Sequence, residues 1–175
     1  NIDTQIKRER AYAHNLSVAQ DRANNDALTG VKNKYAYGAE EKRLDKMLQD
    51  GQKISFAIAV CDINGLKQIN DTLGHQEGDR FIICGCKLLC DIFSHSPIFR
   101  IGGDEFAIIL QDKDYEQRED LMEILQRKNT ENQKKGDVVI AAGIECYQGE
   151  ESVSDVFKRA DEKMYQNKKL LKGEE

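Results

Sequence analysis

The segment "RIGGDEFAIIL", from Arg100 to Leu110, constrains the fold most strongly because it places a glycine-acid turn between two short apolar runs. "IFRI" before the turn and "FAIIL" after it both have the length and composition of buried strands. Strands joined by so short a turn are expected to pair as an antiparallel hairpin. Asn-Gly or Asp-Gly would close such a turn more simply, so the two adjacent acids, Asp104 and Glu105, need another explanation.

A second apolar run, "KISFAIAVCDI", is continuous rather than alternating, which predicts a central strand covered on both faces. The surrounding segments alternate between helical and strand patterns in the order of the β-α-β-β-α-β motif. We therefore predict an α/β (α+β) fold with a ferredoxin-like, palm-type core, in which helices flank a central, mainly antiparallel sheet. The other expected elements are helices over 34–50, 77–93, 114–131 and 152–172 and a strand over 137–147.

The first part of the chain has a different pattern. Between Ile2 and Ala27, eight positions spaced alternately by four and three residues include six Ile, Leu or Ala residues, which is typical of a thin coiled-coil seam. Two interpretations are equally weighted: a signalling helix that joins an upstream sensor domain and pairs with a partner chain, or a solvated linker. Gly30 is expected to end this helix. We divide the chain into a helix over 1–25 and a globular domain over 26–175.

Composition limits the class of protein. The 39% apolar and 33% charged content is that of a soluble globular domain, and the net charge of -5 argues against a nucleic-acid surface. No apolar run is long enough to span a membrane, so we expect no direct membrane contact in this fragment. The odd number of cysteines and the lack of a CxxC pair favour reduced thiols and a cytoplasmic location. The first residue, Asn1, indicates an excised fragment, so an upstream region could anchor the full-length protein in a membrane.

The acids of the hairpin turn are expected to meet a third carboxylate. We predict that the strand ending in "CDI" lies beside the strand that ends at Arg100, which brings Asp62, Asp104 and Glu105 to one edge of the sheet. Neighbouring carboxylates repel one another unless cations lie between them, and oxygen ligands suit Mg²⁺ or Mn²⁺. Gly102 and Gly103 would let phosphate approach the backbone and let the turn adopt unusual dihedral angles.

Four segments together resemble the GGDEF domain family of diguanylate cyclases. They are "DALTGVKNK", "DINGLKQINDTLGHQEGD", "RIGGDEF" and "ADEKMYQNKK", which occur in the family's order and span roughly residues 24 to 172. The resemblance implies an enzyme that condenses two GTP into cyclic di-GMP and releases two pyrophosphates. It also implies a homodimer, in which each of two facing subunits holds one GTP.

The resemblance assigns metal and catalytic roles to the acids. Asp62, the backbone carbonyl of Ile63 and Asp104 would bind two divalent ions, Mg²⁺ or Mn²⁺, in each active site. Asp104 would also accept the proton of the attacking 3′-hydroxyl. Glu105 would act as a second ligand or support the other ligands.

Asn70 and Asp79 resemble the family's guanine-binding residues. A carboxylate can accept hydrogen bonds from both N1–H and the exocyclic amine of guanine, a pair that adenine does not present, so the implied substrate is GTP rather than ATP. From the residues alone, Asn70 could equally be a loop cap and Asp79 an acid at a helix N-terminus. His75 matches the pattern as a residue lining the nucleotide site, but an ordinary loop histidine is an equal alternative.

The triphosphate would be held by backbone groups and lysines. The resemblance places the backbone of Gly65 and Leu66 against the terminal phosphates, with Gly103 in the hairpin turn giving further room for close approach. The positive charge would come from the lysines of two segments, Lys67, Lys168 and Lys172. For each lysine the alternative is a solvated surface charge.

Four residues depart from the family's usual pattern. Asn64 stands where an acid is common, Gly65-Leu66 replaces an aromatic pair, and Lys34 replaces an arginine. These changes leave open an alternative of another class, a catalytically silent GTP-binding regulatory module. A cyclase that also uses ATP is disfavoured by Asp79.

The family's product-inhibition motif, RxxD, would end five residues before the first glycine of the turn. Here that position is occupied by "FSHS", from Phe93 to Ser96. We therefore predict no feedback inhibition by cyclic di-GMP through this site.

Overall fold

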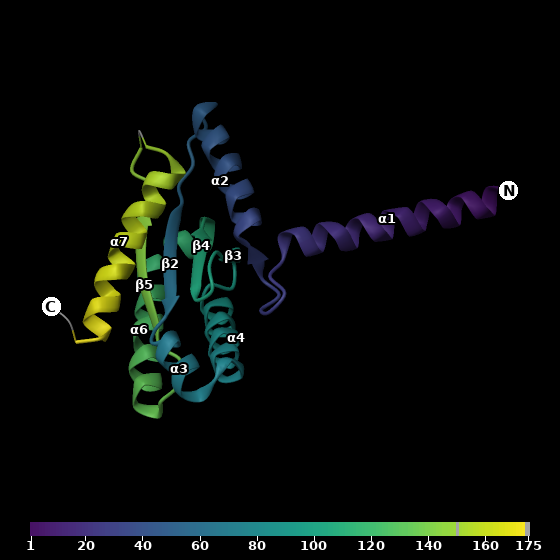
Figure 1. Ribbon diagram of the computed structural model, residues 1–175. Helices are drawn as coiled ribbons and strands as arrows, with labels where there is room; N and C mark the ends of the chain where they lie inside the picture. Colours follow the sequence, from purple (N-terminus) through teal and green to yellow (C-terminus); the bar gives the residue numbers. More distant parts are fainter. Residues whose placement is uncertain (150, 174–175) are drawn as a thin grey trace.

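The structure is a computed structural model that describes residues 1–149 and 151–173. This part of the chain contains both helices and strands (Figure 1). The helices are α1 (Ile2–Asn24), α2 (Lys34–Gln49), α3 (Leu66–Leu73), α4 (His75–Ile92), α5 (Asp112–Glu116), α6 (Arg118–Lys135) and α7 (Val153–Leu171). The strands are β1 (Lys32–Asn33), β2 (Ala57–Ile63), β3 (Ile98–Arg100), β4 (Glu105–Leu110) and β5 (Ile140–Cys146).

The five strands form one sheet in the order β1-β3-β4-β2-β5. β2 pairs antiparallel with both β4 and β5, and β3 pairs antiparallel with β4 in the predicted hairpin. Only the two-residue strand β1 is parallel to its neighbour. This mainly antiparallel sheet with flanking helices confirms the predicted fold class.

One expected neighbour was wrong. β2 does not lie beside β3, because β4 lies between them. In the split β-α-β arrangement the second strand of the hairpin inserts next to the first strand of the core, and the first strand of the hairpin stays outside it. The turn between β3 and β4 nevertheless lies at the end of β2, so the predicted meeting of the acids does not depend on this error.

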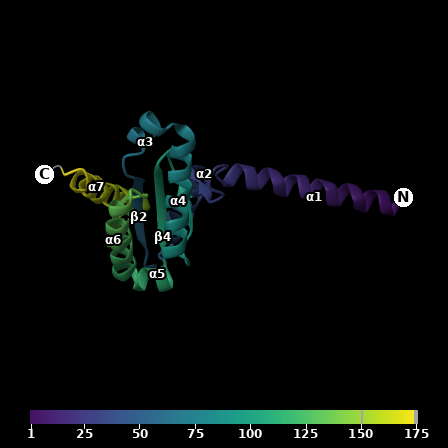
Figure 2. The same cartoon turned by 90° about the horizontal axis from the view of Figure 1, so that it is seen from below.

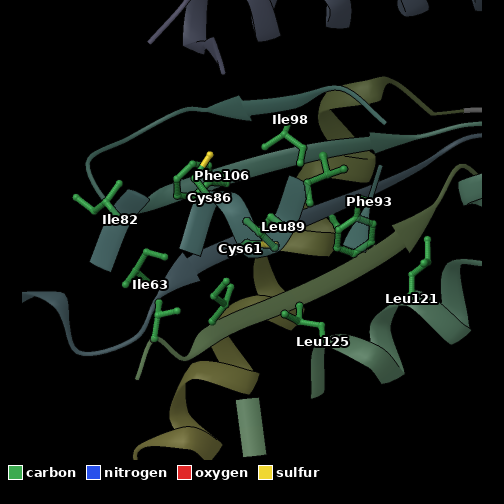
Figure 3. Packing of buried hydrophobic residues seen from close by; sticks show 14 of the residues in the cluster. Cys61, Ile63, Ile82, Cys86, Leu89, Phe93, Ile98, Phe106, Leu121 and Leu125 are labelled. Atoms are coloured by element: carbon green, nitrogen blue, oxygen red, sulfur yellow. The ribbon is translucent and has the colours of Figure 1, made fainter. Parts of the chain in front are cut away.

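β2 is buried along its whole length because helices cover both faces of the sheet. Cys61 and Ile63 point into a cluster that includes Leu89 of α4 and Leu125 of α6 (Figure 3). Side chains at alternate positions, such as Val60, point to the other face, where residues of α2 and α7 complete a second cluster. Both faces of β2 are thus covered, as its continuous apolar sequence predicted.

The backbone of α7 lies directly on β5 at Gly143. A Cβ atom at this position would lie 2.3 Å from the backbone nitrogen of Met164 and 2.4 Å from the carbonyl oxygen of Ala160. Neither backbone atom can rotate away as a side chain could. Gly143 therefore fixes how closely the last helix packs against the sheet.

The outer edge of β5 is bound by side-chain amides. Asn129 of α6 accepts a hydrogen bond from Ile140 N–H at 2.9 Å and donates one to the carbonyl of the same residue at 2.7 Å. Asn167 of α7 accepts a hydrogen bond from Ala142 N–H at 3.0 Å. These two helices thus satisfy backbone groups that an edge strand otherwise leaves open.

α1 projects away from the rest of the chain (Figures 1 and 2). None of its residues, all of which the structure describes, is buried, and Ile2 and Leu16 are exposed. The helix ends at Asn24, before the expected end at Gly30, which instead closes a turn by donating a hydrogen bond to the carbonyl of Asp26. None of the helices in the described residues has the length and apolar character needed to cross a membrane.

Other helix boundaries follow local chemistry. Asn33 caps α2 by accepting hydrogen bonds from Tyr35 and Ala36 N–H, as expected. The helix predicted over 114–131 is instead divided into α5 and α6. α3 and α4 are separated by Gly74, whose φ of 91° turns the second helix back onto the first.

Candidate active site

The acids of β2 and of the hairpin meet at one edge of the sheet, as predicted. Asp62 lies directly opposite Glu105 in the β2–β4 pairing. Ile63 N–H donates a hydrogen bond to the backbone carbonyl of Asp104 at 2.9 Å, which fixes the turn against the end of β2. The Asp62 side chain is only 3% exposed.

The electrostatics of this edge favour binding of a cation. Burial raises the pKa of Asp62 to about 6, and the negative charge of Asp104 contributes in the same direction. Burial also raises the pKa of Glu105, to which the charges of Asp104 and then Asp161 of α7 add. The acids therefore destabilise one another's charged forms, and a positive ion between them would relieve this repulsion.

Lys168 of α7 already supplies one positive charge. Its Nζ lies 3.3 Å from Oδ1 of Asp62, and it opposes the rise in the pKa of that acid. Lys172 follows at the C-terminal end of the same helix and is exposed. Of the two predicted phosphate-binding lysines of α7, the structure thus places Lys168 at the acidic edge.

The residues at this edge fit a hard divalent ion that takes some of its ligands from the protein and the others from a bound substrate and water. In the part of the chain that the structure describes, no three His, Cys, Asp or Glu side chains converge into a group able to hold a metal ion by themselves. Mg²⁺ usually needs only one or two protein carboxylates and takes its other ligands from water and phosphate. Asp62 and Asp104, with the carbonyl of Ile63, offer such a partial set.

Arg100 of β3 holds the hairpin turn. Its Nε and Nη2 donate to the carbonyl oxygen of Gly103 at 3.2 and 2.7 Å, and its Nη1 contacts both carboxylate oxygens of Asp26 at 3.1 and 3.2 Å. Burial by itself would raise the pKa of Asp26, but hydrogen bonds from Thr29 and Arg100 hold it below the usual 3.8. Arg100 thus joins the turn after α1 to the residue before Asp104.

The two glycines of the turn differ from expectation in one respect. Neither Gly102 nor Gly103 has a positive φ, so the turn does not need the unusual dihedral angles that we expected. A Cβ at Gly102 would lie 3.2 Å from Oε2 of Glu105, whereas one at Gly103 would meet nothing within 4 Å. Gly103 therefore stands beside open space.

The predicted base-reading residues lie on the α3–α4 pair. Asn70 of α3 is half-buried, and its side chain packs against Gly78, the neighbour of Asp79 on α4. Asp79 and His75 are both exposed in the first turns of α4. The structure thus brings Asn70 next to the backbone that carries Asp79.

The loop after β2 presents a helix N-terminus. Gly65 adopts the left-handed conformation, with φ 69°, and precedes the first turn of α3, where Leu66 is buried and Lys67 is exposed. The first N–H groups of a helix have no partner within the helix and attract anions. Asn64 donates its N–H to Val139, while its Oδ1 is buried without a hydrogen-bond partner within the described residues.

The segment at the position of the RxxD motif is partly buried, at Phe93 and Ser96, and exposed at Ser94 and His95. Phe93 is part of the core, and Ser96 Oγ and His95 N–H donate hydrogen bonds to Asp114 at 2.6 and 3.1 Å. Asp114 is itself buried. Phe93, Ser96 and the backbone of His95 are thus engaged by the domain, whereas the His95 side chain is exposed.

Sequence reasoning gave no role to three residues near the site. They are Arg100, Asp161 and Gly78. A charged residue inside the apolar strand "IFRI" was a usable indication for Arg100. The other two required knowledge of how the helices pack.

Comparison with known proteins gives a consistent result. The family model described as "Diguanylate cyclase, GGDEF domain" matches residues 23–173. Relatives include "Probable diguanylate cyclase DgcJ" of Escherichia coli (strain K12), 37% identical over 145 residues, and "Diguanylate cyclase DgcP" of Pseudomonas aeruginosa, 30% identical over 167 residues. These matches cover 82% and 91% of this chain but only 29% and 25% of the relatives.

A solved structure has the same architecture, including the projecting helix. The coiled coil and GGDEF domain of DgcB from Caulobacter crescentus, crystallised with c-di-GMP, superposes with a TM-score of 0.82. The two chains are 26% identical, and the match covers 96% of this chain and 92% of the other. From the family match and these relatives, the chain belongs to the GGDEF domain family of diguanylate cyclases.

Proposed function

We propose that this domain is a diguanylate cyclase that condenses two GTP molecules into cyclic di-GMP. The observation that carries the proposal is the pairing of buried Asp62 with Glu105 beside a turn that presents Asp104. This arrangement is unfavourable without a bound cation, and a nucleoside triphosphate brings such ions with it. Family membership supplies the identity of the reaction.

The proposed reaction joins two nucleotides symmetrically. The 3′-hydroxyl oxygen of each GTP forms a bond to the α-phosphorus of the other, and the bond to the β-phosphate bridging oxygen breaks. Two pyrophosphates leave with the bonding electron pairs. The carboxylate of Asp104 is proposed to accept the hydroxyl proton, and Glu105 supports it from the start of β4.

Divalent ions are proposed to be held by Asp62, Asp104 and the carbonyl of Ile63. When bound, they would neutralise the triphosphate and acidify the attacking hydroxyl. Lys168, now paired with Asp62, would be free to turn toward phosphate once an ion replaced it. The N-terminus of α3 after Gly65 is suited to the terminal phosphates, with Lys67 beside it.

Substrate selection is assigned to the α3–α4 pair. Asp79 would accept hydrogen bonds from guanine N1–H and the exocyclic amine, and Asn70 would add its amide. His75 is the first residue of α4 and is proposed to line the base site.

A second copy of the domain is needed because each site supplies one of the two nucleotides. We propose that α1 forms this homodimer as a coiled coil, since its apolar seam lies exposed in the isolated chain. The same helix would transmit the state of an upstream sensor domain.

The test is incubation with GTP and Mg²⁺, followed by chromatographic separation of the products. We expect cyclic di-GMP and pyrophosphate in a 1:2 ratio, with product formation reduced at least about a hundredfold in Asp104→Asn. Ultracentrifugation of the same sample shows whether the protein is dimeric under assay conditions. A dimer that binds GTP but forms no product would overturn the proposed activity.

The alternative is a GTP-binding module without catalysis. It is favoured by Asn64, two residues after Asp62, which occupies a position where the family commonly has an acid and whose buried Oδ1 has no hydrogen-bond partner among the described residues. In that case Asn64→Asp would restore product formation in an otherwise inactive dimer. If the parent is already active, the same substitution should change its rate only modestly.

A further inference from the structure

Gly78, the fourth residue of α4, is the glycine at which an added Cβ atom would make the closest contact in the chain. A Cβ atom built on it would lie 1.7 Å from Oδ1 and 2.8 Å from Cγ of Asn70. Real Cβ atoms do not approach other heavy atoms this closely. The side chain of Asn70 therefore occupies the space that any larger residue at position 78 would need.

The conflict differs from those at two other crowded glycines. At Gly85 an added Cβ would meet the core side chain of Ile63, and at Gly143 it would meet the backbone of α7. Both of those glycines are required by the packing of the fold. At Gly78 the conflicting atoms are the terminal atoms of one half-buried side chain, which could rotate away without moving the backbone.

The fold alone therefore does not account for glycine at position 78. Glycine in a helix is less stable than alanine, and φ of Gly78 is not in the left-handed region. What alanine would change is the direction of the Asn70 amide. The requirement at this position is thus one of orientation rather than of stability.

From this we infer that Gly78 is a positioning residue for base recognition, which leaves room for the Asn70 amide in the orientation that selects guanine. The inference rests on the proposed function, because it assigns Gly78 to the same nucleotide site. Gly78 has no side chain and is adjacent to Asp79 in the sequence, so the Asn70 amide packs against the backbone that carries the second proposed base-reading group.

The role of Gly78 can be tested by measuring nucleotide binding without turnover. 3′-Deoxy-GTP and 3′-deoxy-ATP lack the attacking hydroxyl, so their affinities can be measured calorimetrically in the presence of Mg²⁺. For Gly78→Ala we expect about a tenfold loss of 3′-deoxy-GTP affinity, as for one lost hydrogen-bonding group, with no change for 3′-deoxy-ATP. Its Tm should equal or exceed that of the parent.

Gly38→Ala is the matched control, because a Cβ there would meet nothing within 4 Å in helix α2. It should raise Tm by about 2 to 4 °C and leave both affinities unchanged. Asn70→Ala removes the atoms that conflict with residue 78. In that background Gly78→Ala should cause no further loss of 3′-deoxy-GTP affinity.

The outcomes separate the inference from the proposed function. A parent that fails to bind 3′-deoxy-GTP would refute the proposed function itself. If the parent binds but Gly78→Ala binds equally well, or loses as much affinity in the Asn70→Ala background, the positioning role is refuted. A Tm well below the parent's for Gly78→Ala would likewise show that the glycine serves packing.

Discussion

Replacement of Arg100 by glutamine would separate the turn that follows α1 from the hairpin that carries Asp104. Arg100 contacts both sides: the carboxylate of Asp26 and the carbonyl of Gly103. Glutamine keeps much of the side-chain length but has no charge and cannot form the same forked set of bonds. The expected result is a less stable domain in which the turn that carries Asp104 is less well fixed.

The size of the effect follows from burial. The Arg100 and Asp26 side chains are 16% and 18% exposed, so the pair is largely but not fully removed from water. Removal of one partner from a buried pair costs about 3 to 5 kcal/mol, whereas a surface pair contributes about 0 to 1 kcal/mol. For this intermediate case we expect Arg100→Gln to lower the free energy of unfolding by about 2 to 3 kcal/mol.

Urea denaturation of Arg100→Gln, Asp26→Asn and the double variant would measure this. The double-mutant cycle should give a coupling energy of about 1 to 2 kcal/mol. Arg43→Gln is the matched control, because Arg43 pairs with Glu40 at an exposed helix surface and should cost no more than about 0.5 kcal/mol. Product formation from GTP should also fall in Arg100→Gln but not in Arg43→Gln.

Additive effects of the two substitutions, within about 0.5 kcal/mol, would refute the argument. Additivity would mean that the interaction between Arg100 and Asp26 contributes nothing to the free energy of unfolding. Unchanged product formation in a clearly destabilised Arg100→Gln would refute the link to the catalytic turn but not the energetic estimate.

Four further outcomes are expected. Asp104→Asn should reduce product formation at least about a hundredfold while changing the free energy of unfolding by less than about 0.5 kcal/mol, measured by chromatography and urea denaturation. Gly143→Ala should destabilise the domain by about 3 kcal/mol or more in the same denaturation assay; a loss below about 1 kcal/mol would contradict the close approach of α7. Because the pKa of Asp26 is lowered in the folded state, its contribution to stability should be present above the unfolded value near 3.8 and disappear as the pH falls below it. Parent and Asp26→Asn should therefore converge in Tm below that pH, and parallel curves would contradict this. Deletion of residues 1–25 should halve the mass measured by ultracentrifugation, and an unchanged mass would remove α1 from the proposed dimer.

Sequence reasoning identified elements whose pattern is local. The apolar run of β2, the hairpin around Gly102 and Gly103, and the cap at Asn33 all depend on neighbouring residues, and each occurs as expected. The acidic edge was also predictable, because Asp62 ends a strand and Asp104 lies in a turn.

The errors concern features that depend on distant contacts. The order of strands in a sheet cannot be read from their order in the chain. We therefore expected β3 beside β2, where the structure has β4. The two-residue strand β1 exists only through its pairing with β3 and has no periodic pattern. α1 ends at Asn24, shortly before Asp26, whose side chain pairs with Arg100, a residue 74 positions later. Gly78 needed the packing of α4 on α3 before its role was visible.

The amide groups of Asn129 and Asn167 have a consequence for self-association. A strand from another molecule that approached β5 would have to displace both bonds at Ile140 before gaining its first backbone pairing there. Growth of the sheet from copy to copy is thus opposed from the start at this position. In the proposed dimer, two domains held together by their α1 helices would thus be less prone to join irreversibly through their sheets.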